Sequence, residues 1–213
     1  MIKGFIFDID GTLLDSMHVW SDADEIFVTR HGGVYTPELS FCIRSMTFEG
    51  AADYIRTSCG FDMPLPDIVA EITDIVRQKY EEEIPPRPFV TETVNALYER
   101  HIPMCAATSN TRELCLPALA RTGLLDRLAF VLTCDELGVN KDDPAVFLTA
   151  ANRLGLDVAE TAVVEDAPHA AATSKGAGFF TIGVDSGCFG DFERLKDFTD
   201  MRITRFDELL TLI

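Results

Sequence analysis

Two aspartates, Asp8 and Asp10, stand on alternate positions near the start of the chain, just before the dipeptide Gly11-Thr12. The apolar residues around them, F-I-F-D-I at 5–9, predict a short buried strand that ends there. Because ligands of open α/β sheets bind beyond the carboxyl ends of strands, both carboxylates lie where chemistry is expected. One could attack a substrate or bind a cation while the other transfers a proton. A strand that simply enters an Asp-Gly turn would contain the same residues, so the pair alone leaves both interpretations open.

Other polar residues that could do chemistry follow predicted strands or precede predicted helices. They are Thr108, Ser109 and Asn110 after the apolar run 104–107, Glu165 and Asp166 after 162–164, and Lys141 in the loop 138–141. If the sheet is parallel, all of them meet the two aspartates at one edge of it. Carboxylates from separate strands could then bind Mg²⁺ through hard oxygen ligands. Lys141 could contribute a point charge, and Thr108 a hydroxyl donor, to a bound anion.

Each of these groups also has an ordinary structural explanation. Thr108 and Ser109 could cap the helix that follows them. The Glu-Asp pair could do the same for the helix that Pro168 opens, and Lys141 could be solvated. Each explanation is sufficient for its own group, but the occurrence of all four groups in this order favours a single site.

The elements that must position these residues are predicted from the spacing of apolar side chains. Residues 16–83 show helical spacing and no strand signal, which predicts an all-helical insertion. The segment Pro85-Pro86-Arg87-Pro88 predicts a stiff linker, and after it helices alternate with short apolar strands up to a closing helix over 206–212. This alternation predicts an α/β fold with a doubly wound parallel sheet and right-handed crossovers. We therefore expect a core domain of residues 1–15 and 87–213, with a helical domain of residues 16–86 inserted into it.

Composition and charge narrow the classes of function. The 213 residues include 18 Lys and Arg against 35 Asp and Glu, a net charge of −17, which disfavours nucleic acid and an anionic membrane surface as partners. A phosphate-bearing substrate would need local positive charge from a metal, a lysine or backbone amides. The six cysteines form no C-x-x-C pair and have no histidines at zinc spacing, which predicts free thiols of a cytoplasmic protein. No apolar run approaches the ~18 residues of a transmembrane helix, and nothing at the N-terminus resembles a signal peptide.

The motif D-I-D-G-T at 8–12, with Thr108, Lys141 and the pair Glu165-Asp166, resembles the four motifs of the haloacid dehalogenase-like (HAD) hydrolase superfamily. The resemblance covers essentially the whole chain, since the helical block lies where that family inserts a helical cap. It is closest to the β-phosphoglucomutase and phosphoglycolate phosphatase branch, through D-G-T-L-L-D-S at 10–16 and E-D-A-P-H-A-A-A-T-S-K-G-A-G at 165–178. The resemblance implies a Rossmann-like core with an all-helical cap.

The resemblance also implies a mechanism. Asp8 would attack phosphorus and become an aspartyl phosphate, which water then cleaves. Asp10 would protonate the leaving oxygen and later deprotonate that water. Thr108 and Lys141 would hold the phosphoryl oxygens, with backbone amides near Asp10 and Ser109 assisting. The implied ligands of Mg²⁺ are Asp8, the Asp10 backbone carbonyl, Asp166 and Glu165, the last either directly or through water.

Two departures from the family pattern leave the substrate open. The family often has K-P-x-P-D after its lysine, whereas this chain has K-D-D-P-A at 141–145, which adds negative charge near Lys141. The cap's specificity loop has R-S-M-T-F at 44–48, with Phe48 where β-phosphoglucomutase carries an arginine. We expect this loop to face the Asp8 cleft, with Trp20 on the first cap helix as a candidate wall. The candidate substrate-binding residues are Ser109 and Asn110 in the core and Arg44 and Phe48 in the cap.

The leading interpretation is a Mg²⁺-dependent phosphatase that acts on a small phosphorylated metabolite, such as a sugar phosphate, as a monomer or weak dimer. Within the family, Asp10 disfavours dehalogenase and phosphonatase chemistry, because those branches lack that acid/base residue. A β-phosphoglucomutase-type phosphoryl transfer is the alternative, and Phe48 in place of arginine weighs against it. A catalytically silent protein of the same fold is a further alternative, but its expected signature is the loss of Asp8, Asp10 or Lys141.

Overall fold

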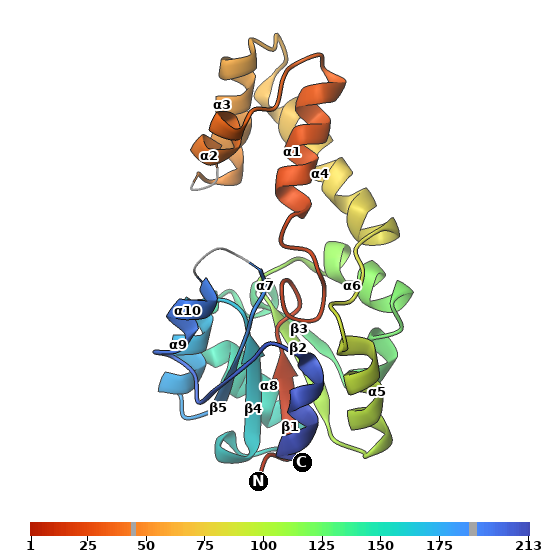
Figure 1. The fold of residues 1–213 in the computed structure, drawn as a ribbon, viewed down its shortest axis with the longest axis vertical. Coiled ribbons are helices and arrows are strands. Elements are labelled where there is room, and N and C mark those ends of the chain that lie inside the picture. Colours follow the sequence, from red (N-terminus) through yellow and green to blue (C-terminus); the bar gives the residue numbers. More distant parts are fainter. Residues whose placement is uncertain (44–45, 188–190) are drawn as a thin grey trace. The chain divides into compact units, whose positions relative to one another are not determined.

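The computed structural model describes residues 1–43, 46–187 and 191–213, and the chain divides into two compact units (Figure 1). The first unit contains residues Met1–Met17 and Ile84–Ile213, and the second contains His18–Glu83. The divisions expected from the sequence, after residues 15 and 86, differ from these by two and three residues.

A parallel sheet of six strands, in the order β3-β2-β1-β4-β5-β6, forms the centre of the first unit. The strands are β1 Gly4–Phe7, β2 Met104–Thr108, β3 Val131–Thr133, β4 Thr161–Glu165, β5 Phe180–Val184 and β6 Met201–Ile203. All residues of β1 are buried, because this strand lies between β2 and β4. The chain leaves β1 toward β2 and β3 and returns to β4, so the strand order reverses beside β1. Ligands of doubly wound sheets bind at the carboxyl ends of the strands next to such a reversal. The α/β fold and the parallel sheet predicted from the sequence are confirmed.

Helices flank this sheet (Figure 1). They are α5 Val90–Glu99, α6 Arg112–Arg121, α7 Cys134–Leu137, α8 Ala145–Leu154, α9 Pro168–Gly176 and α10 Asp191–Leu195, with the 3₁₀ helices η1 Leu125–Arg127, η2 Val158–Glu160 and η3 Phe206–Leu212. The closing helix predicted over 206–212 is present, and it is a 3₁₀ helix. The helices α7 and α10 are not among the predicted ones, because four or five residues are too few to show helical periodicity.

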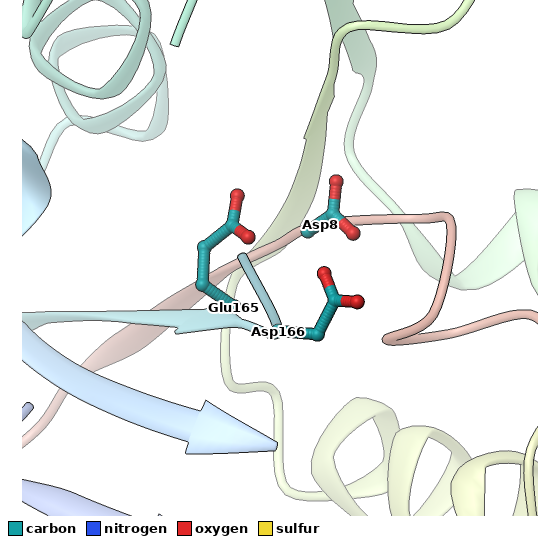
Figure 2. Close-up of side chains that lie close together, drawn as sticks. All are labelled: Asp8, Glu165 and Asp166. Carbon is teal, nitrogen blue, oxygen red and sulfur yellow. The ribbon is translucent and has the colours of Figure 1, made fainter. Parts of the chain in front are cut away.

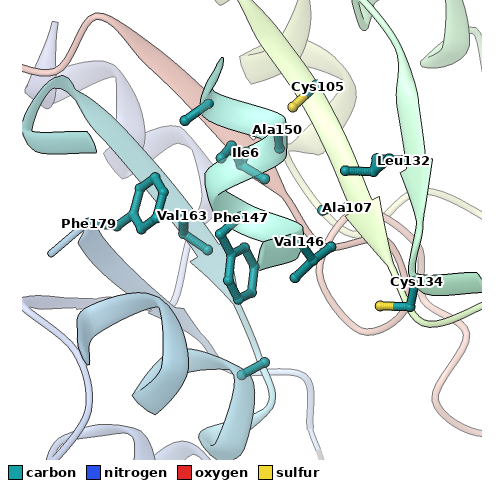
Figure 3. Packing of buried hydrophobic residues seen from close by; sticks show 12 residues of the cluster. Ile6, Cys105, Ala107, Leu132, Cys134, Val146, Phe147, Ala150, Val163 and Phe179 are labelled. Atoms are coloured by element: carbon teal, nitrogen blue, oxygen red, sulfur yellow. The ribbon is translucent and has the colours of Figure 1, made fainter. Parts of the chain in front are cut away.

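Helix α8 packs on the part of the sheet that β1, β2 and β3 form. Its buried side chains join those of the strands in one apolar cluster (Figure 3). The members are Ile6, Cys105, Ala107, Leu132, Cys134, Val146, Phe147, Ala150, Ala151, Val163, Ala170 and Phe179. This packing holds the strand ends and the start of α8 in one place, and the polar residues of the site lie at those ends.

The second unit contains four helices and, among its described residues, no strand. They are α1 Val19–Arg30, α2 Pro37–Ile43, α3 Phe48–Cys59 and α4 Leu65–Glu82. The inward face predicted for α4 is confirmed, because Ile68, Ile72, Ile75 and Val76 are buried. Thr47 begins α3 as its N-cap, and its hydroxyl oxygen accepts a hydrogen bond from the Gly50 amide at 3.2 Å.

The two segments that connect the units are paired with each other. The Asp15 amide donates to the Pro85 carbonyl, and the Arg87 amide donates to the Leu13 carbonyl, each at 3.0 Å. The proline-rich linker predicted from the sequence is therefore held as a short antiparallel bridge around Leu14. Among the described residues, no helix has both the length and the apolar character needed to span a membrane.

Candidate active site

Three carboxylates from two neighbouring strands meet at the carboxyl edge of the sheet (Figure 2). Asp8 follows β1, and Glu165 and Asp166 come at the end of β4. The parallel pairing of β1 with β4 continues to this point, because the Asp8 amide donates to the Val164 carbonyl at 3.0 Å. One carboxylate oxygen from each of the three residues lies within 4.8 Å of the others, and all three residues are buried. Sheet register alone therefore brings residues 157 positions apart into one acidic cluster.

Lys141 reaches this cluster from the loop between α7 and α8. Its side chain is buried, and Nζ contacts both Oδ1 of Asp8 and Oε1 of Glu165. The neighbouring acidic residues Asp142 and Asp143 are exposed instead. Oδ1 of Asp143 accepts a hydrogen bond at 2.8 Å from the amide of Ala145, the first residue of α8. The two aspartates of K-D-D-P-A are therefore exposed to solvent and do not add their negative charge to the acidic cluster.

Burial and crowding of like charges dominate the electrostatics of the cluster. Burial, assisted by Glu165, Asp166 and Asp10, raises the pKa of Asp8 well above its usual range, although Lys141 opposes this shift. Burial and the charge of Glu165 raise the pKa of Asp166 to about 7. Burial would lower the pKa of Lys141, but the charges of Asp8 and Glu165 raise it above its ordinary value, so the ammonium stays protonated. One ammonium does not neutralise three carboxylates, and the cluster has the charge and the hard oxygen donors to bind a divalent cation.

Asp10 lies beside the cluster, and hydrogen bonds from Ser16 and Asn110 help to hold it. Ser16 Oγ donates to its Oδ1 at 2.6 Å, and Asn110 Nδ2 donates to its Oδ2 at 2.9 Å. The carboxylate is less buried than that of Asp8 and lines the same cavity. The partners fix the orientation of Asp10 toward the cavity, which suits a group that transfers protons.

The end of β2 supplies the other side of the site. The Thr108 side chain is buried, and its Oγ1 accepts a hydrogen bond from the Asn110 amide at 3.0 Å. Ser109 is exposed. Both residues, with Asp8, Asp10 and Lys141, line a cavity of about 370 Å³ within the first unit, a volume suited to a metabolite. The site residues that the sequence predicts in the core therefore come together at one cavity.

Gly11 allows the turn after β1 to pass close to Asp166. Its φ is +80°, and an added Cβ would lie 2.3 Å from Oδ2 of Asp166. Any larger residue would therefore have to displace a carboxylate of the acidic cluster.

Of the cap residues predicted to bind substrate, Arg44 lies outside the described residues, and Phe48 is not among the described residues that line the core cavity. Phe48 belongs to the second unit, where its ring packs edge-on against Trp20 with 5.0 Å between ring centroids. Their role in substrate binding stays a prediction.

Several residues of the site were not predicted from the sequence. Ser16 lies in the quoted D-G-T-L-L-D-S stretch, but its hydrogen bond to Asp10 depends on the turn geometry. His169, which lies in the quoted stretch 165–178, lines the cavity from α9, and Asp191 and Arg194 line it from α10, where no strand end or motif marked them. Only the position of Asp191 and Arg194 on a short helix beside the sheet edge reveals them.

A family model described as haloacid dehalogenase-like hydrolase matches residues 5–184 of the chain. Among characterised relatives, validoxylamine A 7′-phosphate phosphatase of Streptomyces hygroscopicus subsp. limoneus is 28% identical over 217 residues, covering 95% of this chain and 97% of its own. A fructose-1-phosphate phosphatase of Escherichia coli (strain K12) is 26% identical over 181 residues, covering 85% and 95%. 

Solved structures resemble the fold over the whole chain. A protein from Thermotoga maritima, provisionally assigned as a β-phosphoglucomutase, superposes with a TM-score of 0.90 at 21% identity, covering 99% of this chain and 98% of its own. At that level of identity the likeness describes the fold alone.

Proposed function

The chain belongs to the haloacid dehalogenase-like hydrolases and is a phosphoric monoester hydrolase, and we propose that it is a Mg²⁺-dependent phosphatase that works through an aspartyl phosphate. The observation that carries this proposal is the buried group of Asp8, Glu165 and Asp166 around the single ammonium of Lys141. A phosphate dianion cannot approach a carboxylate unless positive charge screens the repulsion, and this group has places for both a lysine and a cation.

The chain's own residues have distinct roles in the proposed reaction. An oxygen of Asp8 attacks phosphorus and forms the aspartyl phosphate as the bond to the leaving oxygen breaks. Asp10 donates a proton to that oxygen and afterwards accepts one from the water that attacks the aspartyl phosphate. The Lys141 ammonium and the Thr108 hydroxyl bind phosphoryl oxygens, with backbone amides near Asp10 and Ser109 assisting. The products are inorganic phosphate and the free alcohol, and Asp8 is regenerated.

The residues that would hold Mg²⁺ are Asp8, Asp166 and Glu165, with the Asp10 backbone carbonyl as a further ligand. The donor set fits, because all the side-chain ligands are carboxylate oxygens, and burial, assisted by neighbouring carboxylates, raises the pKa values of Asp8 and Asp166. When bound, the ion supplies positive charge that offsets the repulsion between phosphate and Asp8.

The substrate that we propose is a small phosphorylated metabolite, with sugar phosphates as the first class to test. Support comes from the cavity volume of about 370 Å³ and from relatives named for validoxylamine A 7′-phosphate and fructose 1-phosphate. We further propose that the protein is a monomer or weak dimer and that it works in the cytoplasm. Free thiols at Cys42, Cys59, Cys105, Cys115 and Cys134 support the cytoplasmic location. In this proposal the second unit acts as the helical cap.

The proposal is tested by measuring phosphate release from a panel of phosphorylated metabolites with Mg²⁺. Wild-type protein should turn over several of them, and Asp8→Asn should lose at least about 1,000-fold in kcat while remaining folded, as its circular dichroism spectrum would show. Turnover by purified Asp8→Asn at the wild-type rate would exclude Asp8 as the nucleophile. A phosphorylated sugar that accumulates as an isomer, without release of phosphate, would instead indicate the mutase alternative.

A further inference from the structure

The short helix α10 brings an ion pair to the cavity. Asp191 and Arg194 both line it, and Arg194 Nη1 donates to Asp191 Oδ1 at 3.1 Å. This contact uses one of the five N–H groups of the guanidinium and one of the two carboxylate oxygens. The Arg194 side chain is 69% exposed and the Asp191 side chain 36%, so donors and acceptors remain accessible next to each other.

Packing and hydrogen bonds hold α10 in place. Leu195 is fully buried, and β5 allows it to approach because Gly183 has no side chain: a Cβ there would lie 3.2 Å from that of Leu195. From β6, Arg202 donates to the Phe192 carbonyl at 2.9 Å and places its guanidinium over the Phe192 ring, 4.8 Å from the centroid. The Asp191–Arg194 pair therefore lies on a helix whose position is fixed by packing, as a binding site with a defined geometry requires.

The formal charges around the cavity argue against a second anionic group on the substrate. Of the described residues, five carboxylates and two permanent cations line it, a net charge of −3. A divalent cation would leave −1 before the phosphate itself enters. Of the two cations, Lys141 contacts Asp8 and Glu165, and Arg194 is paired with Asp191. A carboxylate or second phosphate near α10 would gain from Arg194 but would be repelled by Asp191.

We propose that the Asp191–Arg194 pair binds the hydroxyl groups of a neutral, polyhydroxylated leaving group and discriminates against leaving groups that carry a second negative charge. Hydroxyls suit the pair because each can donate to Asp191 and accept from Arg194. This inference rests on the proposed phosphatase function and specifies its substrate class. It assigns the discrimination between neutral and charged leaving groups to α10, a helix of the first unit.

The test compares three kinds of phosphate ester with Mg²⁺ present: the best-used member of a panel of hexose and hexitol monophosphates, 2-phosphoglycolate, and 4-nitrophenyl phosphate. The variants are Arg194→Gln and Asp191→Asn. For both, kcat/KM on the polyol phosphate should fall at least tenfold more than on 4-nitrophenyl phosphate, which has no hydroxyl groups to bind. Asp191→Asn should also raise kcat/KM on 2-phosphoglycolate severalfold, since it removes the repelling charge and leaves Arg194 unpaired.

Arg77→Gln is the matched control, because Arg77 forms an ion pair of the same i,i+3 spacing with Asp74 on α4 and does not line the cavity. It should leave all three efficiencies at wild-type values. Equal losses on all three esters, or no loss on the polyol phosphate, would overturn the inference while the phosphatase function stands. The inference would also be overturned if the wild type preferred 2-phosphoglycolate to the polyol phosphate and Arg194→Gln abolished that preference. If the wild type hydrolyses none of the esters, 4-nitrophenyl phosphate included, the phosphatase function fails and this inference fails with it.

Discussion

At the scale of single residues, the site depends on how closely the turn after β1 approaches Asp166. Gly11 both adopts a φ of +80° and leaves room for an Oδ2 that a Cβ would meet at 2.3 Å. Some other glycines of the first unit have a positive φ without any close neighbour. Gly155, at the end of α8, has a φ of +72° and no heavy atom within 4 Å of an added Cβ. Substituting alanine at each position therefore distinguishes the effect of backbone strain, present at both, from the displacement of Asp166, expected only at Gly11.

We predict that Gly11→Ala lowers kcat at least about tenfold, whereas Gly155→Ala leaves kcat unchanged. Both variants should lose about 1–2 kcal/mol of stability, because alanine is strained at positive φ. Steady-state kinetics and denaturant unfolding would measure the two effects. Equal kcat values in the two variants would show that Asp166 tolerates the added methyl group.

Asp24 is a buried carboxyl on the inner face of α1, and its burial predicts a dependence of stability on pH. Burial raises its pKa to about 7 in the folded protein, from about 3.8 when the chain is unfolded. The folded state then binds the proton more tightly, so the stability of the second unit falls as pH rises from about 4 to above 7. Three pKa units set the upper limit of this loss at about 4 kcal/mol.

Asp24→Asn should therefore unfold at higher denaturant concentration than wild type at pH 8, and the two should converge near pH 4. Trp20, the single tryptophan of the chain, lies in the same helix and reports on this unit through its fluorescence. Asp62→Asn, at an exposed position of the same unit, is the control and should change stability little at either pH. An Asp24→Asn advantage that is the same at pH 4 and pH 8 would contradict the prediction.

At the scale of elements, both ends of α5 place non-glycine residues at positive φ. Phe89 precedes the helix with a φ of +66°, and His101 follows it with a φ of +57°. The His101 amide donates to Tyr98 and the Ile102 amide to Leu97, which is the Schellman arrangement that glycine usually ends. Phe89 has a compensating contact, because the Arg205 guanidinium lies 4.3 Å from its ring centroid.

We expect His101→Gly to stabilise the protein by about 0.5–1 kcal/mol, since relief of the left-handed conformation exceeds the entropy that glycine adds to the unfolded chain. Phe89→Gly should be nearly neutral, because it also loses a cation–π contact worth about 0.5–1 kcal/mol. In an Arg205→Ala background, Phe89→Gly should stabilise as much as His101→Gly does. Denaturant unfolding of the four variants tests this cycle, and a Phe89→Gly effect independent of Arg205 would show that the stacking contributes nothing.

At the scale of the whole molecule, a net charge of −17 surrounds a site that must bind phosphate. The chain places the buried Lys141 at this site together with carboxylates that can bind a divalent cation, so the lysine and a bound cation together would supply the positive charge that phosphate needs. A divalent cation should both complete the site and stabilise the folded protein, because it binds carboxylates that repel one another only when folded.

Turnover should consequently vanish in EDTA and return with Mg²⁺, and Mg²⁺ at 100 times its Kd should stabilise the wild type by about 2.7 kcal/mol. Asp166→Asn should lose most of this stabilisation in a thermal melt, whereas Asp126→Asn, at an exposed position of the same unit, should keep it. Full activity in EDTA, or restoration by zinc alone, would contradict a hard oxygen site for Mg²⁺.

Much of this architecture was predictable from the sequence because local patterns determine it. Apolar runs at 5–7, 104–107 and 162–164 specify strands, and the polar residues after each run must then lie at strand ends. Once the alternation with helices implied a parallel sheet, Asp8, Thr108 and Glu165 had to share one edge. The inserted helical block was predictable for the same reason, since its apolar residues recur with helical period.

Only the tertiary structure determines the contacts between segments that no local sequence pattern relates. The position of Lys141 between Asp8 and Glu165, and the hold of Ser16 and Asn110 on Asp10, depend on loop paths. The placement of Asp191 and Arg194 at the cavity likewise depends on how Leu195 packs against β5. Periodicity reports which face of an element is buried, whereas these contacts arise from strand order and side-chain packing, to which residues far apart in the sequence contribute jointly.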